Sequence, residues 1–122
     1  MPFLKLEKGE IMNYNVHITQ KAENDLKEAL NYIEHTLLNK SAADNLLDKA
    51  DEQINTLSFM PNKHKLVDDP ILNMWGIRFI KINNYLAFFI INENLKTVYI
   101  VRILYQKRNW ISILKTEPFS LT

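Results

Sequence analysis

The alternation of apolar and polar residues predicts one short strand near the start of the chain, followed by a helix. The stretch from Tyr14 to Ile18 places Tyr14, Val16 and Ile18 on one face, which is the period-two pattern of a half-buried strand. Thr19 follows as a helix cap, and apolar residues then recur at helical spacing up to Leu37. The resulting stripe consists of Ala22, Leu26, Ala29, Leu30, Ile33 and Leu37.

A second helix is predicted after the short link from Leu38 to Lys40. Ser41 to Asp44 resembles a capping box, with Asp in the place of the usual Glu. Because the link is so short, the two helices must run antiparallel as a hairpin. The apolar stripe of the second helix consists of Leu46, Leu47, Ala50, Ile54 and Leu57. The acidic residues in the early turns of the first helix suit its macrodipole; they are Glu23, Asp25 and Glu28.

Three more strands are predicted after an irregular connection from Ser58 to Gly76. They cover Ile77–Ile82, Tyr85–Ile91 and Thr97–Leu104. The links Asn83-Asn84 and Asn92-Glu93-Asn94 suit tight turns, because asparagine tolerates positive φ, so the three strands form an antiparallel meander. A short helical segment follows Arg108. The order β-α-α-β-β-β predicts an α+β fold in which a helical hairpin packs on an antiparallel sheet.

The predicted strand Tyr85–Ile91 is apolar on both faces, whereas a helical hairpin can cover only one face of a small sheet. Antiparallel sheets with one face in water usually alternate apolar and polar residues. Large exposed apolar surfaces usually mark binding sites. We therefore expect a partner, either another chain or a nucleic acid, on the second face. The alternative is that the C-terminal tail, with Phe119 and Leu121, folds back over this face.

Length and composition indicate an ordinary globular domain. The chain has 122 residues, of which 47% are hydrophobic and 24% charged. We expect one domain over residues 13–115, preceded by an N-terminal extension or alternative start (1–12) and followed by a tail (116–122). The sequence contains no cysteine and no apolar run of the ~18 residues that a membrane span needs. The expected location is the cytoplasm, with no membrane partner.

Charge is distributed unevenly along the chain. Residues 1–60 hold six Lys and ten Asp or Glu, a net charge of −4, and residues 61–122 hold nine Lys or Arg and four acids, a net charge of +5. This asymmetry favours an anionic partner for the second half, although basic residues can also simply keep an apolar sheet soluble.

Six residues of the second half carry the candidate chemistry. Arg102 lies among apolar residues of the last strand, where it is costly unless it is paired or meets an anion. Tyr105 can stack on a base or take part in proton transfer. Arg78 and Lys81 lie three apart on one strand and point to opposite faces. The arrangement suits a metal-free ribonuclease and equally a passive binder, with no metal or cofactor expected. The full set is Arg78, Lys81, Arg102, Tyr105, Lys107 and Arg108.

Three stretches of the sequence resemble the RelE/ParE superfamily, the toxins of type II toxin–antitoxin (plasmid stabilisation) modules. ITQKAENDLKEALNYI resembles the opening strand and helix, KLVDDPILNMWGIRFIKINNYLAFFIINE the middle, and TVYIVRILYQKRNW the last strand. Together they cover residues 13–114. The resemblance implies a small toxin that a cognate antitoxin wraps and neutralises. RelE-like members cleave mRNA in the ribosome without metal, and ParE-like members poison DNA gyrase.

The resemblance also implies roles for individual residues. Arg102 falls where many members have a functional arginine, and Tyr105 near the C-terminal tyrosine or histidine of the nucleases; these two are the predicted catalytic residues. The predicted phosphate- and RNA-binding residues are Arg78, Lys81, Lys107 and Arg108. Departures from the nuclease pattern are Leu86 in the place of a further arginine, no histidine beside Tyr105, and long helices.

Three hypotheses follow. The first is a ribosome-dependent mRNA interferase, favoured slightly because Arg102, Tyr105, Lys107 and Arg108 cluster where an RNA phosphate could bind. The second is a ParE-like inhibitor of gyrase without nuclease activity. The third is an inactive member that binds only its antitoxin.

Overall fold

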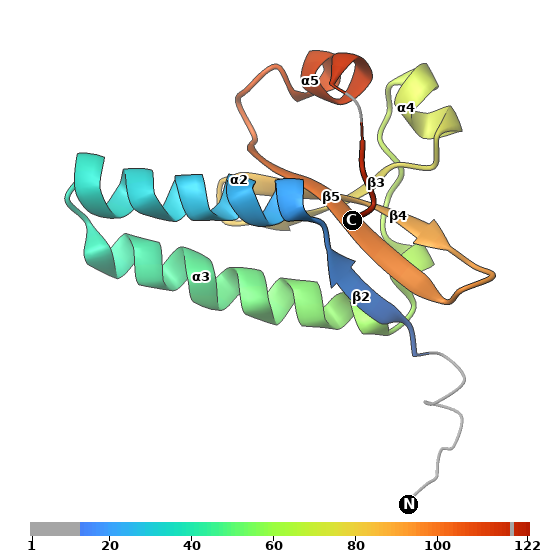
Figure 1. Ribbon diagram of the computed structural model, residues 1–122, viewed down its shortest axis with the longest axis horizontal. Coiled ribbons are helices and arrows are strands. Elements are labelled where there is room, and N and C mark those ends of the chain that lie inside the picture. The colour runs from blue at the N-terminus through green and yellow to red at the C-terminus, as the bar shows by residue number, and fades with distance from the viewer. Residues whose placement is uncertain (1–12, 118) are drawn as a thin grey trace, which may run out of the picture.

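The computed structural model describes residues 13–117 and 119–122, so the predicted extension over residues 1–12 lies outside the described residues. Figure 1 shows a helical hairpin beside a four-stranded sheet, with two short helices near each other above the sheet. The helices are α2 (Gln20–Asn31), α3 (Lys40–Asn55), α4 (Pro70–Met74) and α5 (Trp110–Thr116). The strands are β2 (Asn15–Ile18), β3 (Arg78–Ile82), β4 (Tyr85–Asn92) and β5 (Thr97–Tyr105). The predicted α+β class and element order are confirmed.

Side-chain caps start both helices of the hairpin. Thr19 caps α2: its hydroxyl accepts from the amide of Ala22 (3.3 Å) and donates to the carbonyl of Ile100 in β5 (2.8 Å). The prediction of a cap at Ser41 is wrong, because the side chain of Asn39 accepts from the amide of Ala42 (3.0 Å) and α3 begins one residue before Ser41. Asparagine caps a helix as well as serine does, so a capping-box pattern two residues downstream could not decide the start.

The sheet has the strand order β2-β5-β4-β3. The predicted meander is confirmed, since β3 pairs antiparallel with β4 and β4 antiparallel with β5. In the first turn Asn83 has the expected positive φ (53°). The second turn differs from the prediction: it covers residues 93–96, and Lys96 (φ 48°), not an asparagine, takes the left-handed conformation. β2 runs parallel to β5, with Val16 opposite Val98 and Ile18 opposite Ile100, so the sheet is mixed. The two long helices separate β2 from the meander, and no tight turn therefore fixes its direction.

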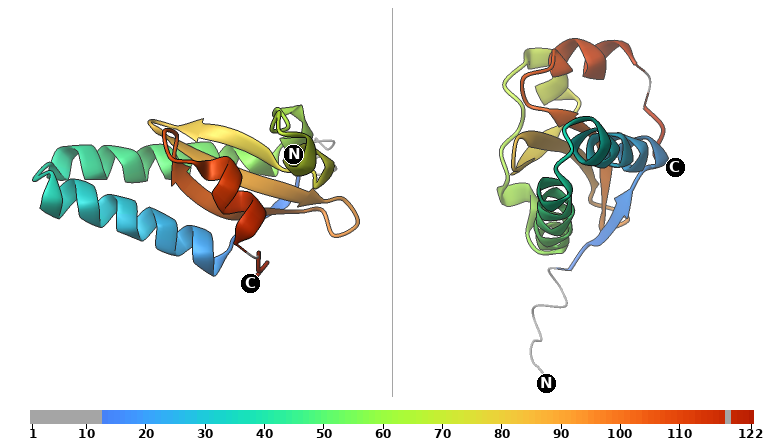
Figure 2. Two further views of the ribbon diagram at one scale, coloured as in Figure 1. Left: turned by 90° about the horizontal axis from the view of Figure 1, so that it is seen from above. Right: turned by 90° about the vertical axis from the view of Figure 1, so that its left-hand side faces the viewer.

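The first face of the sheet packs against the hairpin, as predicted (Figure 2). The buried helical residues that meet it include Ala22, Ala29, Leu46, Ala50 and Ile54. Their partners in the sheet include Ile80, Ile82, Ala87, Phe89, Val98, Ile100 and Ile103. The hairpin extends beyond the end of the sheet (Figures 1 and 2).

The expected external partner on the second face is not needed, because the chain covers that face itself. α4, α5 and the segment before β3 pack over Phe88, Val101 and Leu104. Among the described residues of the predicted tail, Phe119 packs against this cluster, while Leu121 is 41% exposed. α5 and α4 are joined by an ion pair between Lys115 and Asp69 (2.9 Å). The helical segment after Arg108 was predicted and is α5, but α4 was not, because a helix of five residues is too short to give a clear periodic signal. The packing of both helices on the second face was not predicted either.

Within residues 13–117 and 119–122, no helix combines the length and the apolar character that crossing a bilayer requires.

Candidate functional site

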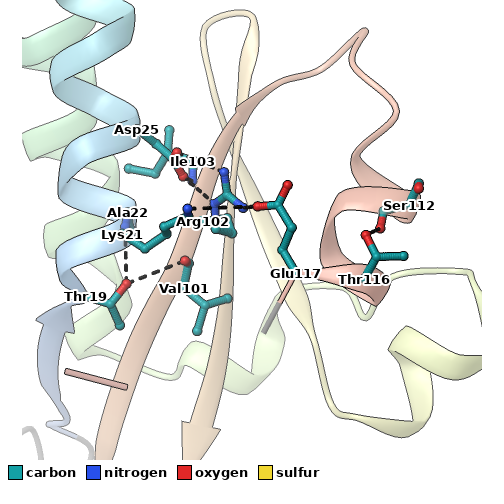
Figure 3. Close-up of polar contacts among 10 residues, drawn as sticks. All are labelled: Thr19, Lys21, Ala22, Asp25, Val101, Arg102, Ile103, Ser112, Thr116 and Glu117. Carbon is teal, nitrogen blue, oxygen red and sulfur yellow. Dashed lines mark hydrogen bonds and ion pairs between the residues drawn. The ribbon is translucent and has the colours of Figure 1, made fainter. Parts of the chain in front are cut away.

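Arg102 lies at an irregularity in β5. Phe88 pairs with Arg102 and Phe89 with Ile100, so Val101 is an extra residue in the β5 side of the ladder. A bulge of this kind turns a side chain away from the regular alternation of a strand. The side chain of Arg102 is only 9% exposed and reaches the edge of the sheet beside α2 (Figure 3).

Two carboxylates bind the guanidinium of Arg102. Asp25 of α2 accepts from Nε (2.7 Å) and Nη2 (3.0 Å), a two-pronged geometry, and also from the backbone amide of Ile103 (3.0 Å). Glu117, just after α5, accepts from Nη1 (2.8 Å). Burial lowers the pKa of Arg102, but the hydrogen bonds and charges of Asp25 and Glu117 outweigh burial, and the pKa is raised. A guanidinium held in its charged form in this way is poorly suited to donate a proton.

The other strand arginine, Arg78, is also bound within the chain. Its Nη1 donates to the backbone carbonyls of Asn62 (3.1 Å) and His64 (2.6 Å) and so holds the turn before β3. Lys81 is exposed. Because Ile80 belongs to the core under the hairpin and Phe79 to the core under α5, Arg78 and Lys81 point to opposite faces, as predicted.

Tyr105 and Arg108 lie in a groove between the hairpin and the end of the sheet. The groove has a volume of about 770 Å³. Its lining is mostly apolar and aromatic, and the charged residues in it are Asp25, which binds Arg102, Glu28 on the helix side and Arg108 on the sheet side. The lining residues are Asp25, Glu28, Ala29, Tyr32, Ile33, Leu37, Asn39, Ala42, Asn84, Tyr85, Ile103, Leu104, Tyr105 and Arg108.

The helical wall of the groove is shaped by a π-helical turn over Tyr32–Thr36. The amide of Leu37 donates to the carbonyl of Tyr32 (3.0 Å), so these two side chains, five residues apart, both line the groove. Tyr32 is 52% and Leu37 55% exposed. On the sheet wall the rings of Tyr85 and Tyr105 meet edge to face, with centroids 5.6 Å apart. Burial, with Tyr105 and Tyr32 nearby, raises the pKa of Tyr85.

The structure therefore brings together only part of the predicted set. Tyr105 and Arg108 share the groove, and Lys107 is exposed in the adjoining turn. Arg102 lies behind the groove wall, bound by Asp25, and Arg78 and Lys81 lie on β3. Their predicted roles stay predictions.

The sequence reasoning missed the two acids that bind Arg102. Asp25 was explained by the helix dipole, although it lies three residues after Ala22 and four before Ala29, on the buried stripe of α2. An acid on a buried stripe signals a buried basic partner, and that signal could have found the pair. Glu117 gave no comparable signal.

Two solved structures share this fold. The chromosomal ParDE toxin–antitoxin system of P. aeruginosa matches with a TM-score of 0.63 and 20% identity, covering 77% of this chain and 97% of that one. The toxin–antitoxin complex RelBE2 of Mycobacterium tuberculosis matches with a TM-score of 0.53 and 19% identity, covering 80% and 97%. Among curated proteins, none matches the sequence significantly.

Fold and sequence together define a type II toxin of the RelE/ParE superfamily. A family model described as the ParE toxin of type II toxin–antitoxin system, parDE, matches residues 16–110. The chain belongs to this family of ParE toxins.

Proposed function

We propose that this toxin is neutralised by a cognate antitoxin and inhibits growth by binding DNA gyrase. The observation that carries the proposal is the match to the ParE family over residues 16–110, which includes the helical hairpin, the sheet and the basic end of β5. ParE-like members of the superfamily poison gyrase, and both solved neighbours are toxin–antitoxin systems.

The geometry of the basic residues supports an inhibitor that is not a nuclease. A metal-free ribonuclease needs cations free to hold phosphate and a group placed to move a proton. Here Asp25 and Glu117 hold the guanidinium of Arg102, and two backbone carbonyls hold Arg78, so neither arginine can meet phosphate without first losing an internal partner. Tyr105 and Arg108 remain accessible, but Lys81 lies on β3, away from the residues that line their groove.

The groove supports a protein partner. A lining of apolar residues with three tyrosines and an arginine has the composition typical of the central residues of protein interfaces. The exposed side chains of Tyr32, Leu37 and Tyr105 provide apolar contact area. The two tyrosines lose little side-chain entropy when a partner binds them.

A second candidate function is ribosome-dependent mRNA cleavage. The observation that favours it is the clustering of Tyr105, Lys107 and Arg108 at the end of β5, where Tyr105 could stack on a base and the two cations could hold phosphate. The likeness to the RelBE2 complex is compatible with this function.

Assays of gyrase and of translation with the purified toxin separate the candidates. Gyrase supercoiling and DNA-cleavage assays should show inhibition with accumulated cleaved DNA, while cell-free translation proceeds and primer extension finds intact mRNA. New 5′ ends that depend on ribosomes, with normal gyrase activity, would establish mRNA cleavage instead. A protein that leaves both systems unaffected yet binds a co-expressed antitoxin would be an inactive member.

A further inference from the structure

Two cations meet at one carboxylate oxygen of Glu117. Nη1 of Arg102 lies 2.8 Å from Oε1 of Glu117, and Nζ of Lys21 lies 3.9 Å from the same oxygen (Figure 3). Lys21 comes from the first turn of α2 and Arg102 from the bulge in β5. The chain therefore builds a small anion site from two elements and places its own carboxylate in it.

The two acids beside Arg102 differ in how firmly they are held. The side chain of Asp25 is 10% exposed, and both of its oxygens accept hydrogen bonds from Arg102 or Ile103. The side chain of Glu117 is 48% exposed and contributes one oxygen to the site. Removing Asp25 would leave the buried charge of Arg102 without its buried counter-charge, whereas another anion could replace the carboxylate of Glu117 at little cost in free energy.

The position of Glu117 also allows its carboxylate to move away from Arg102. It is the first residue after α5, with extended backbone, so rotation of its side chain alone can withdraw the carboxylate. A cavity of about 400 Å³, lined in part by Trp75, Leu114, Glu117 and Phe119, borders it. With Glu117 withdrawn, Asp25 is the one acid that the described residues still pair with Arg102, and Lys21 adds one positive charge in excess.

We propose that Arg102 and Lys21 form an oxyanion-binding site that Glu117 occupies as an internal competitor. The ligand class is a phosphate group, because the guanidinium and ammonium N–H groups that hold the carboxylate of Glu117 suit a phosphate oxygen equally well. The source is either free phosphate or the backbone of a nucleic acid. Arg102, Lys21 and Glu117 are not among the residues that line the groove, although Asp25 belongs to both, and the proposal does not depend on gyrase or the ribosome as the target.

The test measures the affinity of the purified full-length protein for inorganic phosphate and for a short single-stranded oligonucleotide, by NMR titration at low salt. Glu117→Gln removes the competitor while keeping the shape of the side chain. We expect it to bind phosphate at least about tenfold more tightly than the wild type, the effect of losing a charge-assisted hydrogen bond. Glu52→Gln is the matched control, since Glu52 also pairs with one lysine on the surface.

A double variant shows which residues are responsible for the higher phosphate affinity of Glu117→Gln. Lys21→Gln combined with Glu117→Gln should lose most of the added affinity, and because both residues are about half exposed, the variant should fold normally. Arg102→Lys in the Glu117→Gln background should abolish the gain, with circular dichroism to check its fold. A preference for the oligonucleotide identifies nucleic acid as the source, and equal binding identifies free phosphate. Equal affinities of Glu117→Gln and Glu52→Gln would overturn the proposal, as would a gain that survives loss of Lys21 and Arg102.

Discussion

At the scale of the single residue, the pairing of Arg102 with Asp25 fixes how β5 meets the hairpin. β2 pairs with β5 only as far as Ile100, so the following edge of β5 lacks a neighbouring strand. Asp25 takes the place of that strand, because it accepts from the amide of Ile103 as well as from Arg102. One buried carboxylate thus satisfies a backbone donor and a buried cation together.

Asp25→Asn should destabilise the fold strongly. The substitution leaves Arg102 buried with only the half-exposed Glu117 as counter-charge, and breaking a buried pair in this way costs about 3 kcal/mol. Urea denaturation measures the free energy of unfolding. The surface pair Lys49–Glu52 provides the control, where Glu52→Gln should cost less than about 0.5 kcal/mol. Similar losses for both variants would contradict a structural role for Asp25.

His64 should make stability depend on pH in mildly acid solution. Burial, with Lys63 and Arg78 nearby, lowers the pKa of His64 below its ordinary value of 6.5. Its Nε2 is buried, without a hydrogen-bond partner in the described part of the chain. Because the pKa of His64 is lower in the folded chain than in the unfolded chain, the unfolded chain takes up a proton at a higher pH than the folded chain does. The free energy of unfolding is therefore unaffected by the protonation of His64 above pH 6.5 and decreases as the pH falls below that value.

Thermal unfolding between pH 7.5 and 5.5 checks this dependence. His64→Phe should flatten the loss of stability toward acid pH, because phenylalanine keeps the edge-to-face contact with Phe89 and carries no titrating nitrogen. His35→Gln, at an exposed histidine, should leave the dependence in place. An unchanged slope in His64→Phe would assign the effect to other groups.

At the scale of the element, the hairpin depends on the turn between its helices. The π-helical turn ends α2, Leu38 takes a left-handed conformation (φ 53°), and Asn39 then caps α3. This turn directs the exposed apolar end of the hairpin, including Leu37, toward the groove. A stable start of α3 therefore matters for the groove wall as well as for the helix.

Asn39→Ala should cost about 1 kcal/mol of unfolding free energy, the usual loss for a helix cap. Ser41→Ala should be neutral or slightly stabilising, because Ser41 lies inside the first turn of α3 and alanine favours helix. Chemical denaturation of both variants decides between the two cap positions. A greater loss from Ser41→Ala would restore the capping box as the start of the helix.

At the scale of the whole molecule, helices cover both faces of the sheet: the hairpin packs on the first face, and α4 and α5 pack on the second. Exposed apolar side chains remain at the hairpin end, as Tyr32 and Leu37, and also beside α4, as Met74 and Trp75. The groove of about 770 Å³ lies at the hairpin end. The groove there is the surface through which we expect this toxin to act.

Arg108→Glu should abolish growth inhibition when the toxin is expressed without its antitoxin. The substitution reverses the charge at the sheet wall of the groove, opposite Glu28, and should change the free energy of unfolding by less than about 0.5 kcal/mol because Arg108 is exposed. Lys65→Glu, an equal reversal at an exposed lysine before β3, is the control and should stay toxic. If Arg108→Glu remained toxic, the groove would not be required for growth inhibition.

The sequence by itself determined the elements that rest on local periodicity and turn chemistry. The two helical stripes, the meander with its turn at Asn83-Asn84 and the order of elements were predicted, and together with three family-like stretches they indicated the superfamily. These features are local because a helix face repeats within four residues and a tight turn is decided by two or three.

Only the tertiary structure decided which segments that are distant in the sequence contact one another. The parallel pairing of β2 with β5, the cover of α4 and α5 on the second face, and the pairing of Arg102 with Asp25, 77 residues away, all join distant segments. The sequence indicated that Arg102 needed an anion but could not show which one. Burial and charge pairing depend on the packing of separate elements, and that packing bound Arg102 to carboxylates of its own chain while leaving Arg108 in the open groove.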